Sequence, residues 1–482
     1  MARLKEYNGH YCESEYEYAF IGFLEAEGWK YSSGNNISRV TKRDVLIADD
    51  FKKFIADTNP DLTEDEVTQI YDNVRLVGAE SDFATLHKGY GWMVNGVQFT
   101  PQDGLPRMIP LIDFDNWDKN IFRVVNQFTV EYTNNGQKEN RRPDVLLFVN
   151  GIPLCVIELK NPADANATIY DAWEQINIRY WRDIPHLLHY CPLACISDGV
   201  KTRLGTVRTP YEHFYAWRRV NEGDVVSTLP FAETETMIKG VYTPERFVEI
   251  FRDYIYFQDS IYDSDEVEII CRYPQFFAAK LLKQSIVNSV VTRSGKGGTY
   301  FGATGCGKTY TMAFLARQLA LRCTDIQEIG SPTIILIVDR DELQKQGSKL
   351  FTKSKEFLNL GEVSVVKNRT QLRQELGARQ SGGFYICTIQ KFCDRKDDKI
   401  GLINDRQNII CFSDEAHRTQ LEHSKKIQFS KDADENMKAM VSKPYAKVLK
   451  EAFPHATFVG FTGTPIAETY QTFGDEIDRY TM

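Results

Sequence analysis

The sequence has no long apolar segment, although 42% of its 482 residues are hydrophobic. Its longest apolar runs, such as 333–338, have the length of a strand and are far too short to cross a bilayer. The first thirty residues are charged and aromatic and contain no apolar core of signal-peptide length. These absences exclude a membrane-spanning helix and a secretory leader, so we expect a cytoplasmic protein that does not bind membranes.

Cysteine pairs of the Cys-x-x-Cys type are also absent. The ten cysteines are scattered, and Cys191 and Cys195 lack nearby partners at zinc-site spacing. We therefore expect reduced cysteines that pack as small buried hydrophobes. A positive net charge is missing as well, since the formal net charge is −8. No global basic field attracts nucleic acid, and any DNA contact must come from a local groove.

The chain is too long for one ordinary hydrophobic core, and its length suggests about three domains. Residues 13–28 have the apolar stripe of an amphipathic helix, and Thr63-x-x-Glu66 predicts a capping box at the start of another. Buried strands are predicted around 121–160. From about residue 260, short apolar runs alternate with helical stretches, which is typical of a doubly wound parallel sheet.

Residues 302–309 match the phosphate-loop pattern, with a short strand before them and a helix after them. The glycines let backbone N–H groups turn inward around a β-phosphate, and the helix N-terminus adds its positive dipole end. Lys308 is expected to reach the β- and γ-phosphates, and the Thr309 hydroxyl to bind Mg²⁺. We therefore expect an ATP site that includes Thr304, Gly305, Cys306, Gly307, Lys308 and Thr309.

A second nucleotide motif follows a predicted strand at 409–413, which ends in Asp414-Glu415-Ala416-His417. An acidic pair at the carboxyl end of a parallel strand lies where such sheets bind ligands. Asp414 would hold Mg²⁺, and Glu415 would polarise the attacking water. The two motifs in this order predict nucleotide hydrolysis and disfavour a Gly-rich turn that binds nothing.

Residues 414–417 together with 462–465 resemble motifs II and III of superfamily 2 helicases and translocases. Segments 339–343 and 388–392 resemble that family's motifs along the DNA path. Tyr273-Pro274-Gln275 resembles its adenine-reading segment, which implies that Gln275 pairs with the base; a surface polar residue is the open alternative. The family's second lobe is missing from the sequence, so the fragment alone is expected to bind nucleotide, to hydrolyse it poorly and not to translocate.

Asp144, Glu158 and Lys160 form a D-x13-E-x-K series across two predicted strands. Paired carboxylates suit Mg²⁺, a hard cation that prefers oxygen ligands. The metal would lower the pKa of a bound water and stabilise charge on a phosphate, while Lys160 would help to orient the nucleophile. For the bare spacing, a structural ion pair at a strand end is the stronger alternative.

Whether Asp144 shares a face with Glu158 depends on the connecting turn. A two-residue Asn-Gly turn would place Asp144 opposite Ile157, on the face away from Glu158. A three-residue loop would place it opposite Val156 and diagonally beside Glu158. The metal chemistry therefore predicts the three-residue loop, with Gly151 in the left-handed conformation.

Segments at 111–115, 124–128, 141–144 and 150–162 resemble the R subunit of type I restriction enzymes. The nuclease of that family is of the PD-(D/E)xK class, so the resemblance implies catalytic roles for Asp144, Glu158 and Lys160. Ser14-Glu15 resembles the place where such nucleases often carry a supporting acid, with a solvated helix residue as the alternative for Glu15.

The same family carries a Gln-x-x-x-Tyr pair after the catalytic lysine. The nearest match here is Gln175 and Tyr180, which are one residue further apart. Residues four apart share a face of an α-helix, whereas residues five apart do not. Tyr180 fits the family's pattern well because Asp183-Ile184-Pro185 follows it as expected, but the role of Gln175 is in doubt. The stretch at 214–219 is expected to be a half-buried strand with snorkelling arginines.

We predict an α/β protein with a PD-(D/E)xK nuclease domain at 1–260 and a first RecA-like motor lobe at 261–482. The resemblance implies ATP-driven translocation on double-stranded DNA and Mg²⁺-dependent cleavage. It also implies partners, a methyltransferase subunit and a specificity subunit that reads the DNA sequence. The alternatives are a free-standing nuclease–helicase of the repair type and a nucleotide-gated DNA-binding scaffold whose nuclease site is inactive.

Overall fold

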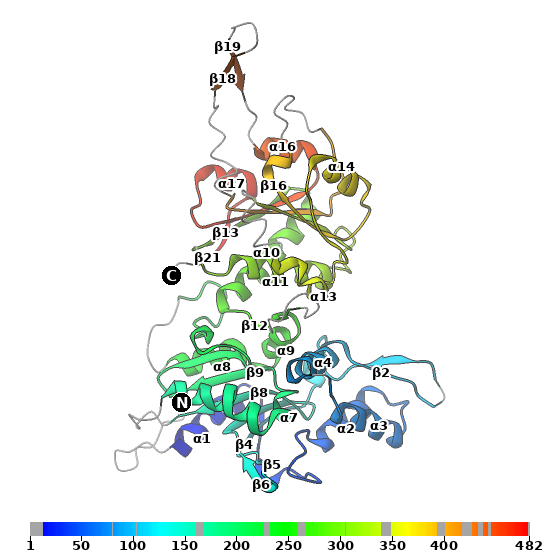
Figure 1. The fold of residues 1–482 in the computed structure, drawn as a ribbon, viewed down its shortest axis with the longest axis vertical. Coiled ribbons are helices and arrows are strands. Elements are labelled where there is room, and N and C mark those ends of the chain that lie inside the picture. Colours follow the sequence, from blue (N-terminus) through cyan, green and yellow to red (C-terminus); the bar gives the residue numbers. More distant parts are fainter. Residues whose placement is uncertain are drawn as a thin grey trace. The chain divides into compact units, whose positions relative to one another are not determined.

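The computed structural model describes two compact units (Figure 1), not the three domains that the chain length suggested. The first contains the described residues up to Phe257 together with 267–272, and the second contains Gln258 and the described residues from Tyr273 onward. The boundary predicted between 260 and 261 falls outside the described residues, which are 13–79, 81–102, 104–160, 168–225, 232–258, 267–303, 305–338, 349–392, 401–416, 427–431, 437–441 and 445–480.

A six-stranded mixed sheet forms the centre of the first unit, with strand order β1-β4-β7-β8-β9-β10. β1 is parallel to β4 and β8 is parallel to β9, whereas the remaining neighbours are antiparallel. Every residue of β7 and β8 is buried, which explains their unbroken apolar sequence. The strands are β1 (Lys30–Ser33), β4 (Phe122–Asn126), β7 (Val145–Val149), β8 (Ile152–Leu159), β9 (Leu193–Ser197) and β10 (Thr202–Thr206).

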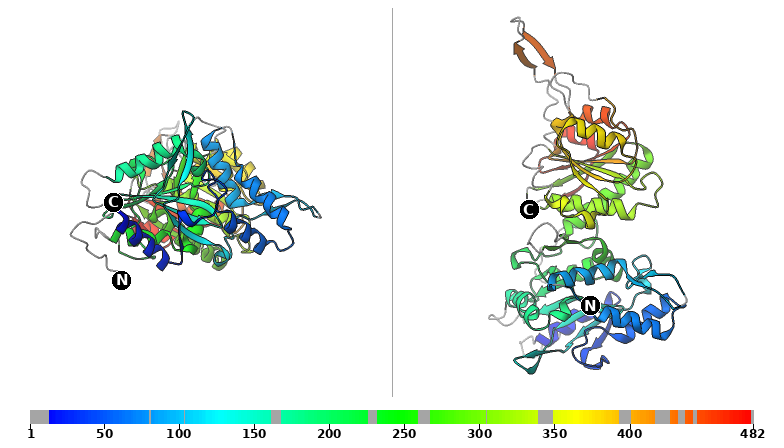
Figure 2. Two further views of the ribbon diagram at one scale, coloured as in Figure 1. Left: turned by 90° about the horizontal axis from the view of Figure 1, so that it is seen from below. Right: turned by 45° about the vertical axis from the view of Figure 1, so that its right-hand side comes forward.

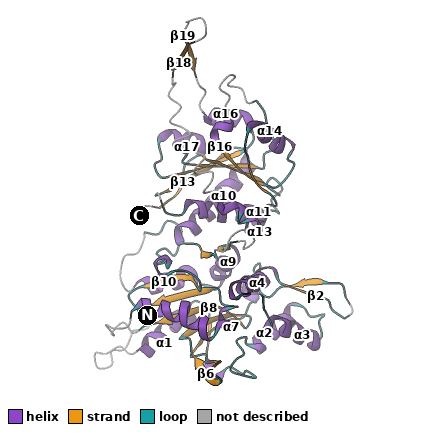
Figure 3. Cartoon of the chain, viewed as in Figure 1, coloured by secondary structure: helices purple, strands orange, loops and turns teal. Residues whose placement is uncertain are grey.

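The first unit also contains three two-stranded pairs and a set of mostly short helices (Figure 3). The pairs are β2 (Val97–Phe99) with β3 (Arg107–Ile109), β5 (Val130–Asn134) with β6 (Gln137–Arg141), and β11 (Ile255–Phe257) with β12 (Glu268–Ile270). The helices are α1 (Glu13–Ala26), η1 (Gly34–Asn36), α2 (Ala48–Thr58), α3 (Glu64–Arg75), α4 (Asp82–Asn95), η2 (Trp117–Lys119), α5 (Ile169–Glu174), η3 (Gln175–Tyr180), α6 (Trp181–Asp183), α7 (Pro185–Leu188), η4 (Tyr211–His213), α8 (Ala232–Val241) and α9 (Pro244–Asp253).

Local sequence signals explain where two of these helices begin and end. The helix predicted over 13–28 is confirmed as α1, although it ends at Ala26. Gly28, at φ 106°, then turns the chain into β1. The capping box predicted at the start of α3 is confirmed, because Thr63 and Glu66 each accept a hydrogen bond from the other's backbone N–H.

The second unit is built on a seven-stranded sheet in which every pairing is parallel, with order β15-β16-β14-β17-β20-β13-β21. The doubly wound, RecA-like lobe that the sequence predicts is therefore confirmed. The strands are β13 (Lys296–Gly302), β14 (Thr333–Val338), β15 (Val363–Val365), β16 (Phe384–Thr388), β17 (Ile409–Asp414), β20 (Thr457–Thr462) and β21 (Glu476–Tyr480), and a separate hairpin joins β18 (Ile427–Lys431) to β19 (Met437–Val441).

Helices lie on both faces of this sheet (Figure 2). α14, α16 and α17 contribute buried side chains to one core with the strands, through residues such as Leu372, Leu449 and Phe473. The helices of the unit are α10 (Tyr273–Thr292), α11 (Lys308–Arg322), α13 (Lys355–Leu358), α14 (Arg369–Ala378), η6 (Ile389–Phe392), α16 (Tyr445–Ala452) and α17 (Ala467–Phe473).

Two expectations drawn from composition can be compared with the described residues. Each cysteine among them is buried and free of disulfide bonds, as expected for small hydrophobes in the core. No helix in the described part of the chain has both the length and the apolar character needed to cross a membrane.

Candidate functional site

The three-residue loop predicted between β7 and β8 is wrong. Asn150 and Gly151 have φ values of 51° and 75°, and Val149 pairs with Ile152, so the turn has two residues. Asn-Gly favours this turn because both central residues need positive φ. A Cβ on Gly151 would also lie 2.2 Å from the carbonyl oxygen of Ile47, so close packing requires glycine as well.

A β-bulge restores the alignment that this turn alone would destroy. The register of the β7–β8 pair shifts by one residue next to Pro153, which has no N–H to donate to a regular ladder. Beyond the shift, Val145 lies opposite Ile157. The residues next to them, Asp144 and Glu158, therefore lie across from each other on one side of the sheet.

The two carboxylates are held differently. Asp144 is partly exposed, and its Oδ2 accepts a hydrogen bond from the Leu159 N–H at 2.8 Å. Glu158 is fully buried; its Oε1 accepts from the Tyr180 hydroxyl at 2.6 Å, and its Oε2 has no hydrogen-bond partner within the described residues. Burial, and secondarily the charge of Asp144, raise the pKa of Glu158 well above its usual value. A buried acceptor without a donor, beside a second carboxylate, fits a divalent cation.

Three hydrogen bonds link Lys160 to Glu158. Lys160 Nζ donates to Gln175 Oε1 at 3.0 Å, and Gln175 Nε2 donates to the Tyr180 hydroxyl at 2.9 Å. The Tyr180 hydroxyl completes the series on Glu158 Oε1. The four side chains are thus part of one network, in which Gln175 connects the lysine to the tyrosine.

A π-helix explains how Gln175 reaches Tyr180. Residues 175–180 form the π-helical segment η3 between α5 and α6. Its wider turn carries i→i+5 bonds, so residues five apart lie over one another, as residues four apart do in an α-helix. The extra residue in the Gln/Tyr spacing is absorbed at this point. The five-residue spacing therefore does not keep Gln175 away from Tyr180, and a catalytic role for Gln175 stays a prediction.

Helix α1 carries two acidic residues near the sheet, and they face different ways. Glu15, the predicted supporting acid, is partly exposed, and its Oε2 is buried with no hydrogen-bond partner among the described residues. Glu17 is only 6% exposed, and it accepts hydrogen bonds from the side chains of Asn126 and Gln127 at 2.6 and 2.7 Å. Residues two apart lie about 200° apart around a helix, so the two carboxyls leave opposite sides of α1.

Sequence reasoning overlooked Glu17, yet a signal was present. Glu17 lies three, four and seven residues before Phe20, Ile21 and Leu24, which form the buried stripe of α1. An acidic residue on an apolar stripe requires polar partners inside the fold.

The phosphate loop joins β13 to α11 in the second unit. Gly305 and Gly307 have φ values of 81° and 85°, as the inward-turning backbone requires. Lys308 Nζ donates to the Gly302 carbonyl at 3.2 Å and lies 3.7 Å from Glu415 Oε1. The structure therefore brings the lysine of the first motif near an acid of the second, and the expected contacts of both with a nucleotide stay predictions. Thr304, His417 and residues 339–343 lie outside the described residues.

The acidic pair lies at the carboxyl end of β17, next to β20. Glu415 has a φ of 49°, and its N–H donates to Asp414 Oδ1 at 3.0 Å. Burial, and then the charge of Glu415, raise the pKa of Asp414 to about 6, while Lys308 acts in the opposite direction. Thr309 lies in the first turn of α11. Asp414 and Thr309 are the residues that could hold Mg²⁺ here, and Cys306 is a buried part of the loop.

Gln275 lies in the first turn of α10 and is only 4% exposed. Its Nε2 donates to the Gly307 carbonyl at 3.3 Å, and a Cβ on Gly307 would lie 2.5 Å from that nitrogen. Gln275 is therefore not a surface polar residue but packs against the phosphate loop. Its contact with adenine stays a prediction.

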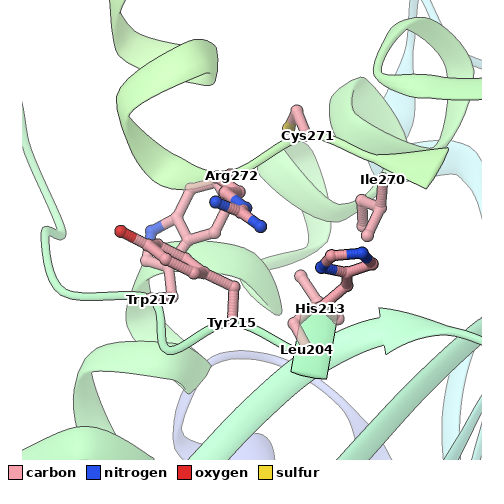
Figure 4. A pocket seen from close by; sticks show the side chains of 7 residues that line it. All are labelled: Leu204, His213, Tyr215, Trp217, Ile270, Cys271 and Arg272. Atoms are coloured by element: carbon pink, nitrogen blue, oxygen red, sulfur yellow. The ribbon is translucent and has the colours of Figure 1, made fainter. Parts of the chain in front are cut away.

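A separate pocket in the first unit lies between β10 and the stretch expected to be a half-buried strand (Figure 4). The expected strand is wrong, because within the described residues that stretch makes only one isolated bridge, from Tyr215 to Leu204. The Arg272 guanidinium lies 4.6 Å from the centre of the Tyr215 ring. None of the predicted site residues lines the pocket, which is formed by Leu204, His213, Tyr215, Trp217, Ile270, Cys271 and Arg272.

Comparison with known proteins assigns both units. Residues 11–213 match the family described as type I restriction enzyme R protein N terminus, and residues 274–482 match the SWI2/SNF2 ATPase family. The HindI endonuclease subunit of a type I restriction enzyme from Haemophilus influenzae is 30% identical over 98% of this chain and 44% of its own length. The provisionally named MjaIXP endonuclease subunit of a type I restriction enzyme from Methanocaldococcus jannaschii is 30% identical over 97% of this chain and 44% of its own.

Among solved structures, a fragment provisionally assigned as the HsdR subunit of a type I restriction enzyme from Vibrio vulnificus YJ016 covers 76% of this chain and 56% of its own. Its TM-score of 0.27 and identity of 15% are too low to support an argument. The chain spans less than half the length of the two relatives named above. On the sequence matches, it belongs to the R (endonuclease) subunits of type I restriction enzymes, with the N-terminal domain of that family followed by a SWI2/SNF2 ATPase region.

Proposed function

We propose that this chain supplies the nuclease and the first motor lobe for ATP-driven translocation on double-stranded DNA coupled to Mg²⁺-dependent cleavage. In this proposal, residues 1–260 are the nuclease domain and 261–482 are the first lobe. The observation that carries it is the network from Lys160 through Gln175 and Tyr180 to Glu158, with Asp144 across from Glu158. It lies in the same chain as a phosphate loop whose lysine faces an acidic pair.

In the nuclease, Asp144 and Glu158 would hold Mg²⁺. When bound, the metal supplies a water of lowered pKa and neutralises charge on the phosphate. Tyr180 fixes the orientation of Glu158 through the hydrogen bond to Oε1. Gln175 holds the Lys160 ammonium at the edge of the site, where it can orient a nucleophile. Because the pKa of Glu158 is raised, metal binding should release a proton from this carboxyl.

DNA contact is supported by a local group of cations beside Asp144. Arg142, two residues before Asp144, is exposed, as are Lys42 and Arg43. The Lys42 carbonyl accepts from the Glu131 N–H on β5, which brings this loop to the β5–β6 pair that leads into Arg142. Lysine and arginine side chains at an exposed surface are suited to contact the phosphates of DNA.

In the motor lobe, Lys308 and the phosphate-loop backbone would bind the β- and γ-phosphates of ATP. Glu415 would orient the attacking water, and Asp414 with the Thr309 hydroxyl would hold the nucleotide's Mg²⁺. The Lys308–Glu415 contact of 3.7 Å is one that a bound phosphate would compete for. Gln275, which packs on Gly307, would pair with the adenine base.

As an R subunit, the chain would act in the cytoplasm with a methyltransferase subunit and a specificity subunit. A test is to reconstitute the complete assembly and follow plasmid cleavage with ATP and Mg²⁺. We expect co-purification with both partners and cutting that requires both cofactors. Cutting without the methyltransferase would favour a free-standing repair-type nuclease–helicase, and ATP-dependent DNA binding without cutting would favour an inactive scaffold.

A further inference from the structure

The residue that follows β4 has a strained backbone. Gln127 has a φ of 54°, a left-handed conformation that residues with a Cβ rarely adopt. Its N–H donates to the carbonyl oxygen of Asp144 at 3.1 Å. A residue in an unfavourable conformation is therefore bonded to the residue that supplies one of the two carboxylates of the nuclease site. Strain of this kind persists only where the surroundings enforce it.

The surroundings of Gln127 do enforce this conformation. Glu17 Oε2 accepts from Gln127 Nε2 at 2.7 Å, and its Oε1 accepts from Asn126 Nδ2 at 2.6 Å. Tyr31 in turn donates to Asn126 Oδ1 at 3.1 Å. On the other side, a Cβ on Gly34 would lie 2.7 Å from the Asn126 carbonyl oxygen and 2.8 Å from that of Gln127. Glu17 is the residue that binds both of these side-chain amides, so it restrains Asn126 and Gln127 together.

We infer that Glu17 is a positioning residue for the nuclease: it holds Gln127 in the left-handed conformation, and Gln127 then fixes the backbone of Asp144. The inference rests on the proposed metal site of Asp144 and Glu158. It differs from the expectation that Glu15 is the supporting acid of α1, because the two carboxyls leave opposite sides of the helix. Glu17 does not touch the metal in this account and acts only through the Gln127 amide.

The experiment measures Mn²⁺ binding to the full chain by calorimetric titration without nucleotide. Every variant carries Asp414→Asn, so that the motor site does not contribute. We expect Glu17→Gln to weaken Mn²⁺ binding by about tenfold or more, the usual effect of removing a residue that orients a metal ligand. Glu25→Gln, at an exposed position on the same helix, is the matched control and should bind as the parent does.

A second pair of variants tests the backbone step directly. Glycine adopts positive φ freely, whereas alanine does not. Both Gln127→Gly and Gln127→Ala lose the bond to Glu17, but the glycine variant should retain more Mn²⁺ affinity than the alanine variant. If Glu17→Gln fails to fold, the comparison of the glycine and alanine variants still tests whether the backbone conformation of Gln127 affects Mn²⁺ binding. A role of Glu17 in stability alone would give the two variants equal affinity.

The outcomes separate the inference from the proposed function. If Glu17→Gln binds Mn²⁺ like the parent while Asp144→Asn does not, the positioning role is refuted and the metal site stands. If Asp144→Asn also binds like the parent, the metal site itself is wrong. Equal affinities for the glycine and alanine variants at 127 would likewise overturn the positioning role.

Discussion

Replacing Glu158 by glutamine should stabilise the first unit while it removes the nuclease. Glu158 is 0% exposed, and its Oε2 has no hydrogen-bond partner within the described residues. Glutamine keeps the oxygen that accepts from Tyr180. Its amide N–H₂ replaces the unpartnered Oε2 and can donate a hydrogen bond toward Asp144. The repulsion between the two carboxylates is then replaced by an attraction between an amide and a carboxylate. Functional sites often retain such unfavourable arrangements at the expense of stability.

The magnitude follows from the buried, unsatisfied oxygen. Leaving a buried polar group without a partner costs about 1–3 kcal/mol, and more when the group is charged. We therefore expect Glu158→Gln to raise the free energy of unfolding by roughly 2 kcal/mol at pH 8. For a unit of this size, each kcal/mol shifts the Tm by about 2–4 °C, so the Tm should rise by about 4–8 °C.

The stability gained by Glu158→Gln should increase as the pH rises. Burial raises the folded-state pKa of Glu158 above its unfolded value, so the folded chain resists ionisation. At low pH, Glu158 is protonated in both the folded and the unfolded chain, so its burial does not lower the free energy of unfolding. The loss of stability grows as the pH rises through the pKa of Glu158 in the unfolded chain toward its higher pKa in the folded chain. The difference in Tm between glutamine and wild type should therefore be largest near pH 8 and smallest near pH 4.

Scanning calorimetry of wild type and Glu158→Gln at both pH values measures this, with Glu25→Gln as the control. A lower Tm for Glu158→Gln at pH 8 would refute the reasoning. It would mean that Glu158 belongs to a stabilising ion pair at a strand end, the alternative that the bare spacing allows. Against that alternative, the described residues contain no ion pair between Lys160 and either carboxylate, and the Lys160 ammonium donates to Gln175.

Three further predictions follow from the geometry. Ile178 is 47% exposed in the π-helical segment, and its deletion should convert this segment to an α-helix with a four-residue spacing between Gln175 and Tyr180. Mn²⁺ binding should then be preserved, and loss of binding in titration would contradict this. Since the pKa of Asp414 is about 6, affinity for Mg²⁺·ATP should fall by about tenfold per pH unit below 6, and a flat profile in fluorescent-nucleotide titrations would argue against a metal role. Gly307→Ala should weaken nucleotide binding, because alanine is strained at the φ of 85° that the loop requires, and unchanged binding in the same titration would contradict this.

Local patterns in the sequence predict much of this fold. The alternation of short apolar runs and helices predicts the parallel sheet of the second unit, and the capping box predicts the start of α3. The phosphate loop and the acidic pair can be located because both lie at strand ends, where residue type and position are linked by the topology of the sheet.

The details of the proposed nuclease site depend on departures from regular periodicity, which the sequence does not reveal. The sequence predicts that a three-residue turn aligns Asp144 with Glu158. In the structure the turn has two residues, and the bulge beside Pro153 aligns the two carboxylates by shifting the register by one residue. The π-helical turn places Gln175 on the face of Tyr180, contrary to α-helical spacing. Each involves one extra residue, and an inserted residue changes which side chains face each other without changing composition or hydrophobic pattern.

The most direct test of the account compares Asp144→Ala and Lys308→Ala in the reconstituted assembly, measuring ATP turnover and plasmid cleavage in the same samples. We predict that Asp144→Ala abolishes cutting and keeps ATP turnover, whereas Lys308→Ala loses both. If Asp144→Ala still cuts DNA, the nuclease assignment is contradicted, and the first unit would be a docking or regulatory module.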